Sequence, residues 1–246
     1  MNKKPHYYMQ TDSRWTERPY RVTGETTTIG DSGCGPTCAA MLITSMTDRV
    51  VTPIDTCAWS MEHGYKAKGQ GTYYSYFTPQ FKEYGIVCTR LNTANVYGKP
   101  KEKVHDTVAE LLREGFYIIA CMGKGLWTSS GHFVVVWWED GCMYINDPAS
   151  QRADRVKGDP ETFRKQVKYY WAVDAREFNK EDEDVTYEEF VKHMERYQKE
   201  RGNEAPSAWA RDGLSQAKEK GITDGTRPRA FATREEVALM VNKAKK

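Results

Sequence analysis

The chain has 246 residues, of which 39% are hydrophobic and 12% aromatic, which is enough apolar material for a packed core. Its 36 basic and 34 acidic side chains leave a formal net charge of +2, which argues against a nucleic-acid-binding protein. No stretch approaches the roughly 18 apolar residues of a membrane span, and no apolar segment follows Lys3 and Lys4 as it does in a signal peptide. We therefore expect synthesis in the cytoplasm, and neither a membrane nor a nucleic acid as partner.

The first part of the chain is rich in aromatic residues, and helical patterns precede strand patterns in it. Helices are predicted at 38–43, 52–64, 72–84 and 102–112, and the last three end near Gly64, Gly85 and Gly115. Strands are predicted at 116–122, 132–138, 142–146 and 167–173, with a tight hairpin at Asp140–Gly141. Helices followed by antiparallel strands predict an α+β fold.

The composition changes near residue 178. The charged run NKEDED at 179–184 predicts a linker between a domain of residues 1–178 and a small helical module of residues 179–246. In the module we expect helices at 186–201 and 208–220 and a turn-rich segment at 221–228. Thr233, with Glu236 three residues later, is typical of an N-cap, and the helix it begins is expected to run to about Lys243.

The six cysteines contain no Cys-x-x-Cys pair and follow no zinc pattern, so we expect neither a metal nor a cofactor. Without a signal peptide, reduced thiols are expected rather than disulfides. Most of the six are expected to be core residues. They are Cys34, Cys38, Cys57, Cys88, Cys121 and Cys142.

One of these thiols has a setting that suits catalysis. In the segment GCGPTC at 33–38, a proline in the first turn of a helix places Cys34 at the start of the predicted buried helix. The helix dipole and the unpaired amides at that end stabilise a thiolate and offer donors to an oxyanion. The alternative interpretation is a tight turn in which Cys34 only packs.

His132 is the histidine best placed to act as a base, because it begins a strong strand. Counting back from a two-residue turn at 140–141 puts Val134 opposite Asp147, so that Asp147 lies diagonal to His132 on the same face. This arrangement would supply a base and the group that orients it. A three-residue turn would put Asp147 on the other face, and the pair Asp147–Pro148 also commonly just ends a strand. The other histidines are His6, at a chain end, and His63, His105 and His193, on helices with polar neighbours.

Four segments together resemble a known family. They are YMQTDSRW at 8–15, GCGPT at 33–37, GHFVVV at 131–136 and NDP at 146–148. Over about residues 6–175 the chain resembles the bacteriocin-processing, double-glycine-type cysteine peptidases and their broader relatives, whose fold is papain-like.

The resemblance implies that Cys34 is the nucleophile, His132 the base and Asp147 its orienter. It implies that Gln10 donates to the oxyanion beside the Cys34 amide. Leader-cleaving members are usually fused to a transporter, whereas this chain has no membrane part, and its long gap between Gln10 and Cys34 is similar to the free-standing relatives. The residues with an implied structural role are Asp12, Arg14 and Trp15.

The tail carries a second resemblance. Trp209–Ala210, GITDG at 221–225 and TREEVA at 233–238 resemble a single S-layer-homology-type repeat, of a kind that also follows the catalytic domains of phage lysins. This implies attachment to a cell-wall polymer, although surface proteins usually carry three repeats. Binding through oligomerisation and a merely helical appendage are the alternatives, and Trp209 is either a contact residue or a core residue of this unit.

The expected function is therefore that of a phage or prophage lysin, a cysteine endopeptidase that cuts peptide bonds in peptidoglycan and acts on the wall after release. The alternative is a free-standing cytoplasmic cysteine peptidase that acts on a protein or leader peptide. A binding module with an unreactive thiol and a transferase on the same scaffold are further alternatives.

Overall fold

The structure is a computed structural model that describes residues 2–91, 100–157, 159–179 and 187–245. The chain forms two compact units, Met1–Lys180 and Glu181–Lys246, which are described separately. Within the described residues, every helix is too short or too polar to cross a bilayer. Apart from Asn179, the predicted linker at 179–184 lies outside the described residues.

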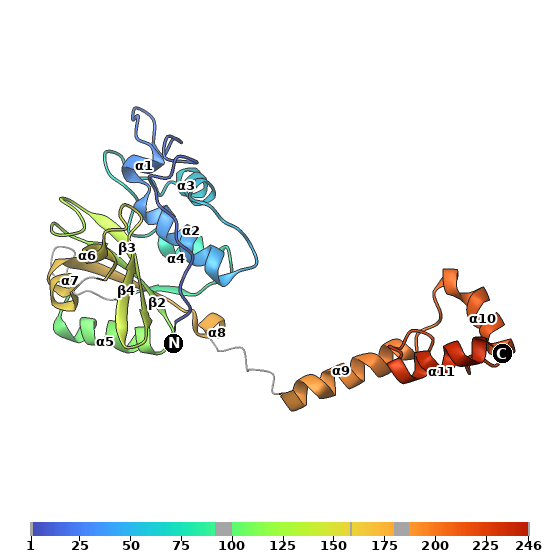
Figure 1. Cartoon of the computed structure of the whole chain (residues 1–246). Coiled ribbons are helices and arrows are strands. Elements are labelled where there is room, and N and C mark those ends of the chain that lie inside the picture. Colours follow the sequence, from blue (N-terminus) through green and yellow to red (C-terminus); the bar gives the residue numbers. More distant parts are fainter. Residues whose placement is uncertain (1, 92–99, 158, 180–186, 246) are drawn as a thin grey trace. The chain divides into compact units, whose positions relative to one another are not determined.

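A five-stranded antiparallel sheet forms the centre of the first unit, with strand order β1-β5-β2-β3-β4 (Figure 1). The strand-rich second half of this unit and the helices before it confirm the predicted α+β class. The predicted strands agree with β2 to β5 to within one residue at each end, whereas β1 was not predicted. The strands are β1 (Cys88–Arg90), β2 (Tyr117–Met122), β3 (His132–Glu139), β4 (Cys142–Asn146) and β5 (Val167–Val173).

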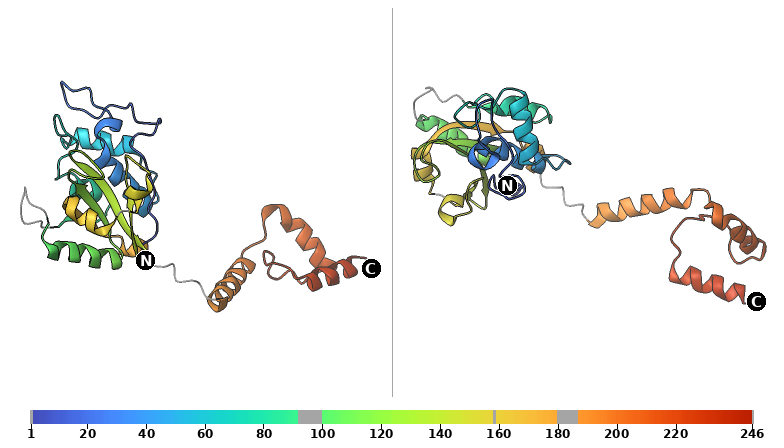
Figure 2. Two further views of the ribbon diagram at one scale, coloured as in Figure 1. Left: turned by 60° about the vertical axis from the view of Figure 1, so that its left-hand side comes forward. Right: turned by 90° about the horizontal axis from the view of Figure 1, so that it is seen from above.

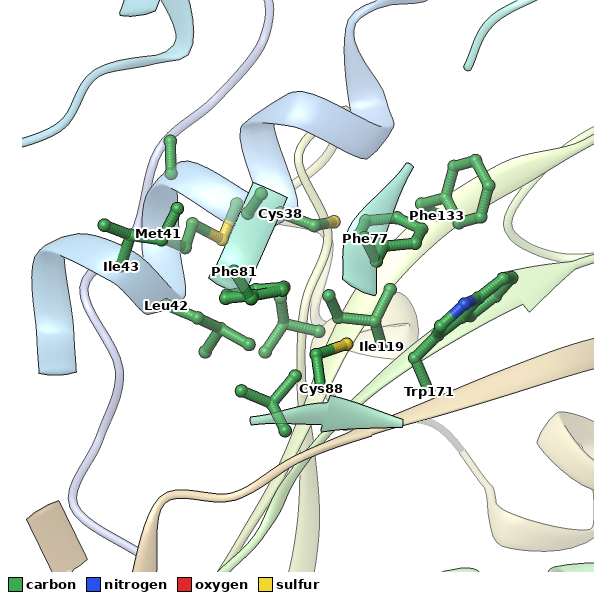
Figure 3. Packing of buried hydrophobic residues seen from close by; sticks show 14 of the residues in the cluster. Cys38, Met41, Leu42, Ile43, Phe77, Phe81, Cys88, Ile119, Phe133 and Trp171 are labelled. Atoms are coloured by element: carbon green, nitrogen blue, oxygen red, sulfur yellow. The ribbon is translucent and has the colours of Figure 1, made fainter. Parts of the chain in front are cut away.

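Helices cover both faces of this sheet (Figures 1 and 2). On one face lie α2 (Cys34–Met46), α3 (Pro53–Glu62) and α4 (Phe77–Lys82), and on the other lie α5 (Glu102–Arg113) and α7 (Pro160–Gln166). Figure 3 shows the core beneath α2, where Met41, Leu42, Phe77, Ile119 and Trp171 meet. Each large apolar side chain that is fully buried here stabilises the fold by about 1.5–3 kcal/mol.

The chain turns sharply just before α2, and this turn sets the position of Cys34. The short helix α1 (Ile29–Ser32) ends at Gly33, which is also the residue before α2. A Cβ atom on Gly33 would lie 2.6 Å from the carbonyl oxygen of Ile29, so a larger residue would not fit. Pro36 lies in the first turn of α2, where a proline costs no helical hydrogen bond. The turn therefore presents Cys34 at the first position of a helix whose residues 34–43 are all buried.

The helix predicted at 72–84 is wrong in its first half, because α4 begins only at Phe77. Instead, Thr72 forms an isolated bridge with Lys66, and the amide of Tyr73 donates to the carbonyl of Tyr65. The hydroxyl of Tyr20 lies 2.6 Å from that of Thr72. These long-range hydrogen bonds replace the helical ones, and helical spacing in the sequence does not reveal them. The other helices of this unit that were not predicted are short: α1, α6 (Ala153–Val156), α7 and α8 (Arg176–Asn179).

Asn179 corrects the prediction of a fully solvated run from that residue onward. Its side chain is only 7% exposed and makes three hydrogen bonds within the first unit. Its Nδ2 donates to the carbonyl of Gly115 (2.8 Å), and its Oδ1 accepts from the amide of Lys3 (2.7 Å) and the hydroxyl of Tyr117 (3.2 Å). Asn179 is therefore a structural residue of the first unit.

The second unit contains four helical segments in its described residues. They are α9 (Tyr187–Gly202), the 3-10 helix η1 (Ala208–Ala210), α10 (Arg211–Glu219) and α11 (Arg234–Ala244). The capping box predicted for α11 is confirmed: the Glu236 amide donates to Thr233 Oγ1 (3.1 Å), and the Thr233 amide donates to the Glu236 carboxylate (2.8 Å). Trp209 in η1 is 88% exposed, which contradicts the interpretation of this residue as core.

Candidate active site

Cys34 lies at the point where helix α2 meets the sheet, and it lines a cleft of about 510 Å³. Helix geometry leaves the first amides of α2 without a helical acceptor. The Cys34 sulfur accepts hydrogen bonds from the side chain of His132 and from the backbone amides of Phe133 and Gly35. The buried helix start predicted from the sequence is thus the observed one.

His132 and Asp147 meet through the hairpin of β3 and β4. The hairpin pairs Glu139 with Cys142 and continues in step to Val135 opposite Asn146. Asp140 and Gly141 both have positive φ (49° and 76°), as a two-residue hairpin turn requires. One step further along, Nε2 of His132 lies 2.7 Å from Oδ1 of Asp147. The three-residue turn considered above is therefore ruled out.

The hydrogen bonds favour a charged pair at this site. Burial by itself raises the pKa of Cys34, but the hydrogen bond and charge of His132 outweigh it, so that the pKa of the thiol falls below its usual value. Burial lowers the pKa of His132, whereas its hydrogen bonds to Asp147 and Cys34 raise it, and the result is a pKa of about 9. Because Nε2 is bonded to Asp147, the ring nitrogen left for Cys34 is Nδ1. Both shifts favour a thiolate–imidazolium pair held by a buried carboxylate.

Asp147 is held from behind by residues that the sequence patterns did not single out. Its Oδ1 also accepts from the amide of Ala149 (2.8 Å). Nε of Arg155 lies 2.9 Å from Oδ2 as an ion pair that falls outside hydrogen-bond geometry, and both side chains are largely buried. The hydroxyl of Tyr7 donates to the Asp147 carbonyl (2.6 Å). These contacts fix the carboxylate and compensate its charge in the interior.

Gln10 is buried next to this group, and its amide points to a backbone carbonyl. The side-chain Nε2 of Gln10 donates to the carbonyl of Gly30 (2.7 Å). The backbone amide of Gln10 donates to the carbonyl of Pro148 (2.8 Å), one residue beyond Asp147. The Oε1 atom is buried without a hydrogen-bond partner. Because one Nε2 hydrogen is bonded to Gly30, the second is the one that remains for an oxyanion. Gln10 itself is not among the residues that line the cleft.

The neighbouring residues of the first motif form a local structure. The Arg14 guanidinium makes two hydrogen bonds to the Asp12 carboxylate (2.9 and 2.8 Å) and stacks 4.3 Å from the Trp15 ring. Trp15 is buried, and its Nε1 donates to the carbonyl of Met9 (2.7 Å). This network holds the segment that carries Gln10.

The loop at 67–74 forms part of the wall of the cleft, and a buried lysine organises it. The Lys66 ammonium donates to the carbonyls of Ala67 (2.8 Å) and Gln70 (2.6 Å) and pairs with the Glu25 carboxylate at 3.2 Å. The Lys66 side chain is completely buried. Glu25 also accepts a hydrogen bond from the amide of Gly69. Neither residue stands out in the sequence, because their partners are backbone atoms of a loop whose path only the fold defines.

The remaining cysteines and histidines do not join this group. All six cysteines are free, and burial raises the pKa of both Cys88 and Cys121 to about 12. His105 was expected on a helix with polar neighbours, but its side chain is buried. Its Nδ1 lies 2.9 Å from the Tyr170 hydroxyl. Among the described residues, no three His, Cys, Asp or Glu side chains are grouped so that they would hold a metal ion.

The comparison with known proteins agrees with this geometry. Residues 6–177 match the family described as "Peptidase_C39 like family", which covers the whole cleft and most of the first unit. No curated protein of similar sequence was found. The family match and the antiparallel sheet packed on α2 together identify a papain-like α+β fold. The chain therefore belongs to the Peptidase_C39 like family, and it is a cysteine peptidase, a hydrolase.

Proposed function

We propose that this cysteine peptidase uses Cys34, His132 and Asp147 as its catalytic triad. The single observation that carries the proposal is the series of hydrogen bonds that runs from Cys34, which lines the cleft, through His132 to the buried Asp147. A thiolate at a helix start, a raised imidazole pKa and a buried carboxylate are the three features that nucleophilic cysteine catalysis requires.

In the proposed reaction the Cys34 thiolate attacks the carbonyl carbon of the scissile peptide bond. The resulting oxyanion accepts a hydrogen bond from the Cys34 amide and, in the proposal, from the second Nε2 hydrogen of Gln10. The His132 imidazolium gives its Nδ1 proton to the leaving nitrogen, and the C–N bond breaks to leave a thioester. His132 then takes a proton from water as that water attacks the thioester. The product acid leaves, and the thiolate–imidazolium pair is restored.

For the substrate we propose peptide bonds of bacterial peptidoglycan, as in phage or prophage lysins. Support comes from the tail, whose GITDG and TREEVA segments resemble an S-layer-homology-type repeat. The described tail also carries an almost fully exposed Trp209 and a hollow of about 450 Å³ lined by both apolar residues, such as Leu214 and Phe231, and polar ones. In this proposal the tail binds cell-wall polymer and raises the local concentration of the peptidase at the wall.

A turbidity assay tests the choice of substrate. Purified full-length protein added to Gram-positive cell walls is expected to clear them, and Cys34→Ala is expected not to. Mass spectrometry of the released fragments then identifies the bond cleaved. If walls stay turbid while a soluble protein or leader peptide is cut, the enzyme is instead a free-standing peptidase acting in the cytoplasm, which is the second candidate.

A further inference from the structure

The cleft that holds Cys34 has an uneven distribution of charged side chains. Among the described residues that line it, none carries a carboxylate, whereas Lys168 contributes an ammonium and His132 its imidazolium. Lys168 lies in β5, next to the strand that carries Cys121. The His132 imidazolium is balanced by the Cys34 thiolate in the same cleft, so Lys168 supplies the net positive charge of the lining. A cleft with a net positive charge attracts a substrate that carries negative charge.

A second cation, Arg90, lies near Cys121 outside the cleft lining and adds to the charge of Lys168. The Lys168 and Arg90 charges both act on the Cys121 thiol, where burial nevertheless dominates and raises the pKa of that thiol to about 12. Cys121 is therefore a neutral thiol, and it does not balance the charge of either cation. Among the described residues, no ion pair involves Lys168 or Arg90.

Aromatic rings hold the Arg90 guanidinium. It lies over the rings of Tyr169 (4.8 Å), Tyr74 (5.7 Å) and Trp171 (5.7 Å). Of these residues, Tyr74 lines the cleft itself, and its hydroxyl is hydrogen-bonded to Cys121. Stacking on aromatic rings orients a guanidinium while leaving its N–H groups available to a ligand.

We propose that Lys168, supported by the charge of Arg90 behind Tyr74, forms a carboxylate-binding subsite of the cleft, so that the preferred substrate is a peptide with a free carboxylate close to the scissile bond. This inference rests on the proposed function, because it names the substrate class of the same cleft. Lys168 provides the charge at the cleft wall, and Arg90 strengthens the positive potential behind Tyr74. Stem peptides of peptidoglycan carry such carboxylates, as do acidic protein segments.

The test uses pairs of short Gly/Ala peptides that carry Glu at one position in the first member and Gln at that position in the second. Full-length protein is incubated with each pair, mass spectrometry locates the cut, and kcat/KM is measured. For the position that reaches the subsite, kcat/KM is expected to be about tenfold higher with Glu, at the lower end of what a hydrogen bond to a charged group contributes. This preference is expected to weaken as salt is added.

Variants assign the preference to the subsite. Lys168→Gln is expected to bring the Glu/Gln ratio close to one, Lys168→Glu to invert it, and Lys168→Arg to retain it. Lys124→Gln is the matched control, because Lys124 is an exposed lysine just beyond β2 that does not line the cleft, and it is expected to keep the wild-type ratio. Melting temperatures identify any variant that fails to fold.

The outcomes separate this inference from the proposed function. Equal kcat/KM for Glu and Gln peptides at every position, or an undiminished ratio in a folded Lys168→Gln protein, overturns the subsite while the peptidase assignment stands. A Glu preference that depends on Lys168, together with walls that stay turbid, supports the subsite and overturns the wall substrate.

Discussion

Nε2 of His132 lies 2.7 Å from Oδ1 of Asp147, and the Asp147 side chain is completely buried. A carboxylate in this position stabilises the imidazolium, and it is the largest of the influences that raise the pKa of His132 to about 9. The ion pair with Cys34 therefore exists at pH values above the lowered pKa of the thiol and below about 9.

Activity should accordingly fall as the pH rises through about 9, because His132 then loses the proton that it gives to the leaving nitrogen. Asp147→Asn removes the charge that raises this pKa, so the alkaline limb of kcat/KM should move to lower pH and kcat should fall by roughly 10²–10⁴-fold. Asp140→Asn in the exposed hairpin turn is the control, and its pH profile should match the wild type. An unmoved limb in Asp147→Asn would contradict the role of Asp147.

Cys34 should be the first of the six thiols to react with an alkylating agent near neutral pH. Its pKa is lowered by His132, whereas burial raises the pKa of both Cys88 and Cys121 to about 12. Mass spectrometry of partly alkylated protein gives the order of labelling. Slower labelling of Cys34 than of Cys121, which lines the same cleft, would refute its assignment as nucleophile. Cys34→Ala should abolish turnover with little change in melting temperature, and Cys142→Ala should retain activity.

Gln10→Ala should lower kcat by roughly 10²–10³-fold with little change in KM if the second Nε2 hydrogen of Gln10 binds the oxyanion. Gln10 Nε2 also donates to the Gly30 carbonyl (2.7 Å), and losing this hydrogen bond could destabilise the fold. The melting temperature of the variant is therefore measured together with its kinetics. A change in KM alone would mean that Gln10 binds substrate. A large loss of stability at unchanged kcat would mean that its bond to Gly30 is its main role.

Lys66→Met should raise KM, because it releases the carbonyls of Ala67 and Gln70 in the loop that lines the cleft. A misplaced binding loop is expected to reduce kcat/KM by roughly tenfold or more. Lys68→Met, an exposed lysine in the same loop, is the matched control and should behave as the wild type. If Lys66→Met lowers the melting temperature but leaves KM unchanged at temperatures where it is folded, Lys66 stabilises the fold without shaping the cleft.

Removal of the tail should leave an active peptidase if the truncation keeps the whole first unit, which ends at Lys180. A protein ending at Lys180 keeps Asn179, and it should fold and cleave soluble peptides. A protein ending at Phe178 loses the three hydrogen bonds of Asn179 and should melt at a lower temperature. On intact walls the protein ending at Lys180 should act more slowly than the full chain, because it lacks the tail.

Trp209→Ala in the full chain tests the wall contact directly. Because Trp209 is 88% exposed, the substitution should weaken wall pull-down without lowering the melting temperature of the tail. Equal wall binding by the full chain and the protein ending at Lys180 would refute the anchoring role, and would favour a peptidase that acts on soluble protein.

Local patterns were sufficient to single out Cys34, His132 and Asp147, the three residues of the proposed triad. A glycine, a cysteine and a first-turn proline predict the start of α2 because each acts through its own backbone conformation. The two-residue turn at Asp140–Gly141 determines the register of β3 and β4 by counting alone, and the register brings Asp147 to His132. Strand period and turn length are short-range properties, so they can be read from consecutive residues.

Tertiary structure alone decided what surrounds Cys34, His132 and Asp147. The ion pair of Lys66 with Glu25 and the hydrogen bond of Asn179 to Gly115 join residues far apart in the chain, and the ion pair of Arg155 with Asp147 spans an irregular segment after β4. The segment at 72–76 has helical spacing, but its hydrogen bonds go to Tyr65 and Tyr20 instead. Such contacts depend on how loops cross the surface of the sheet, and no periodicity in the sequence encodes that path. The positive charge of the cleft emerges in the same way, because Lys168 and Arg90 come together only through the pairing of β1, β5 and β2.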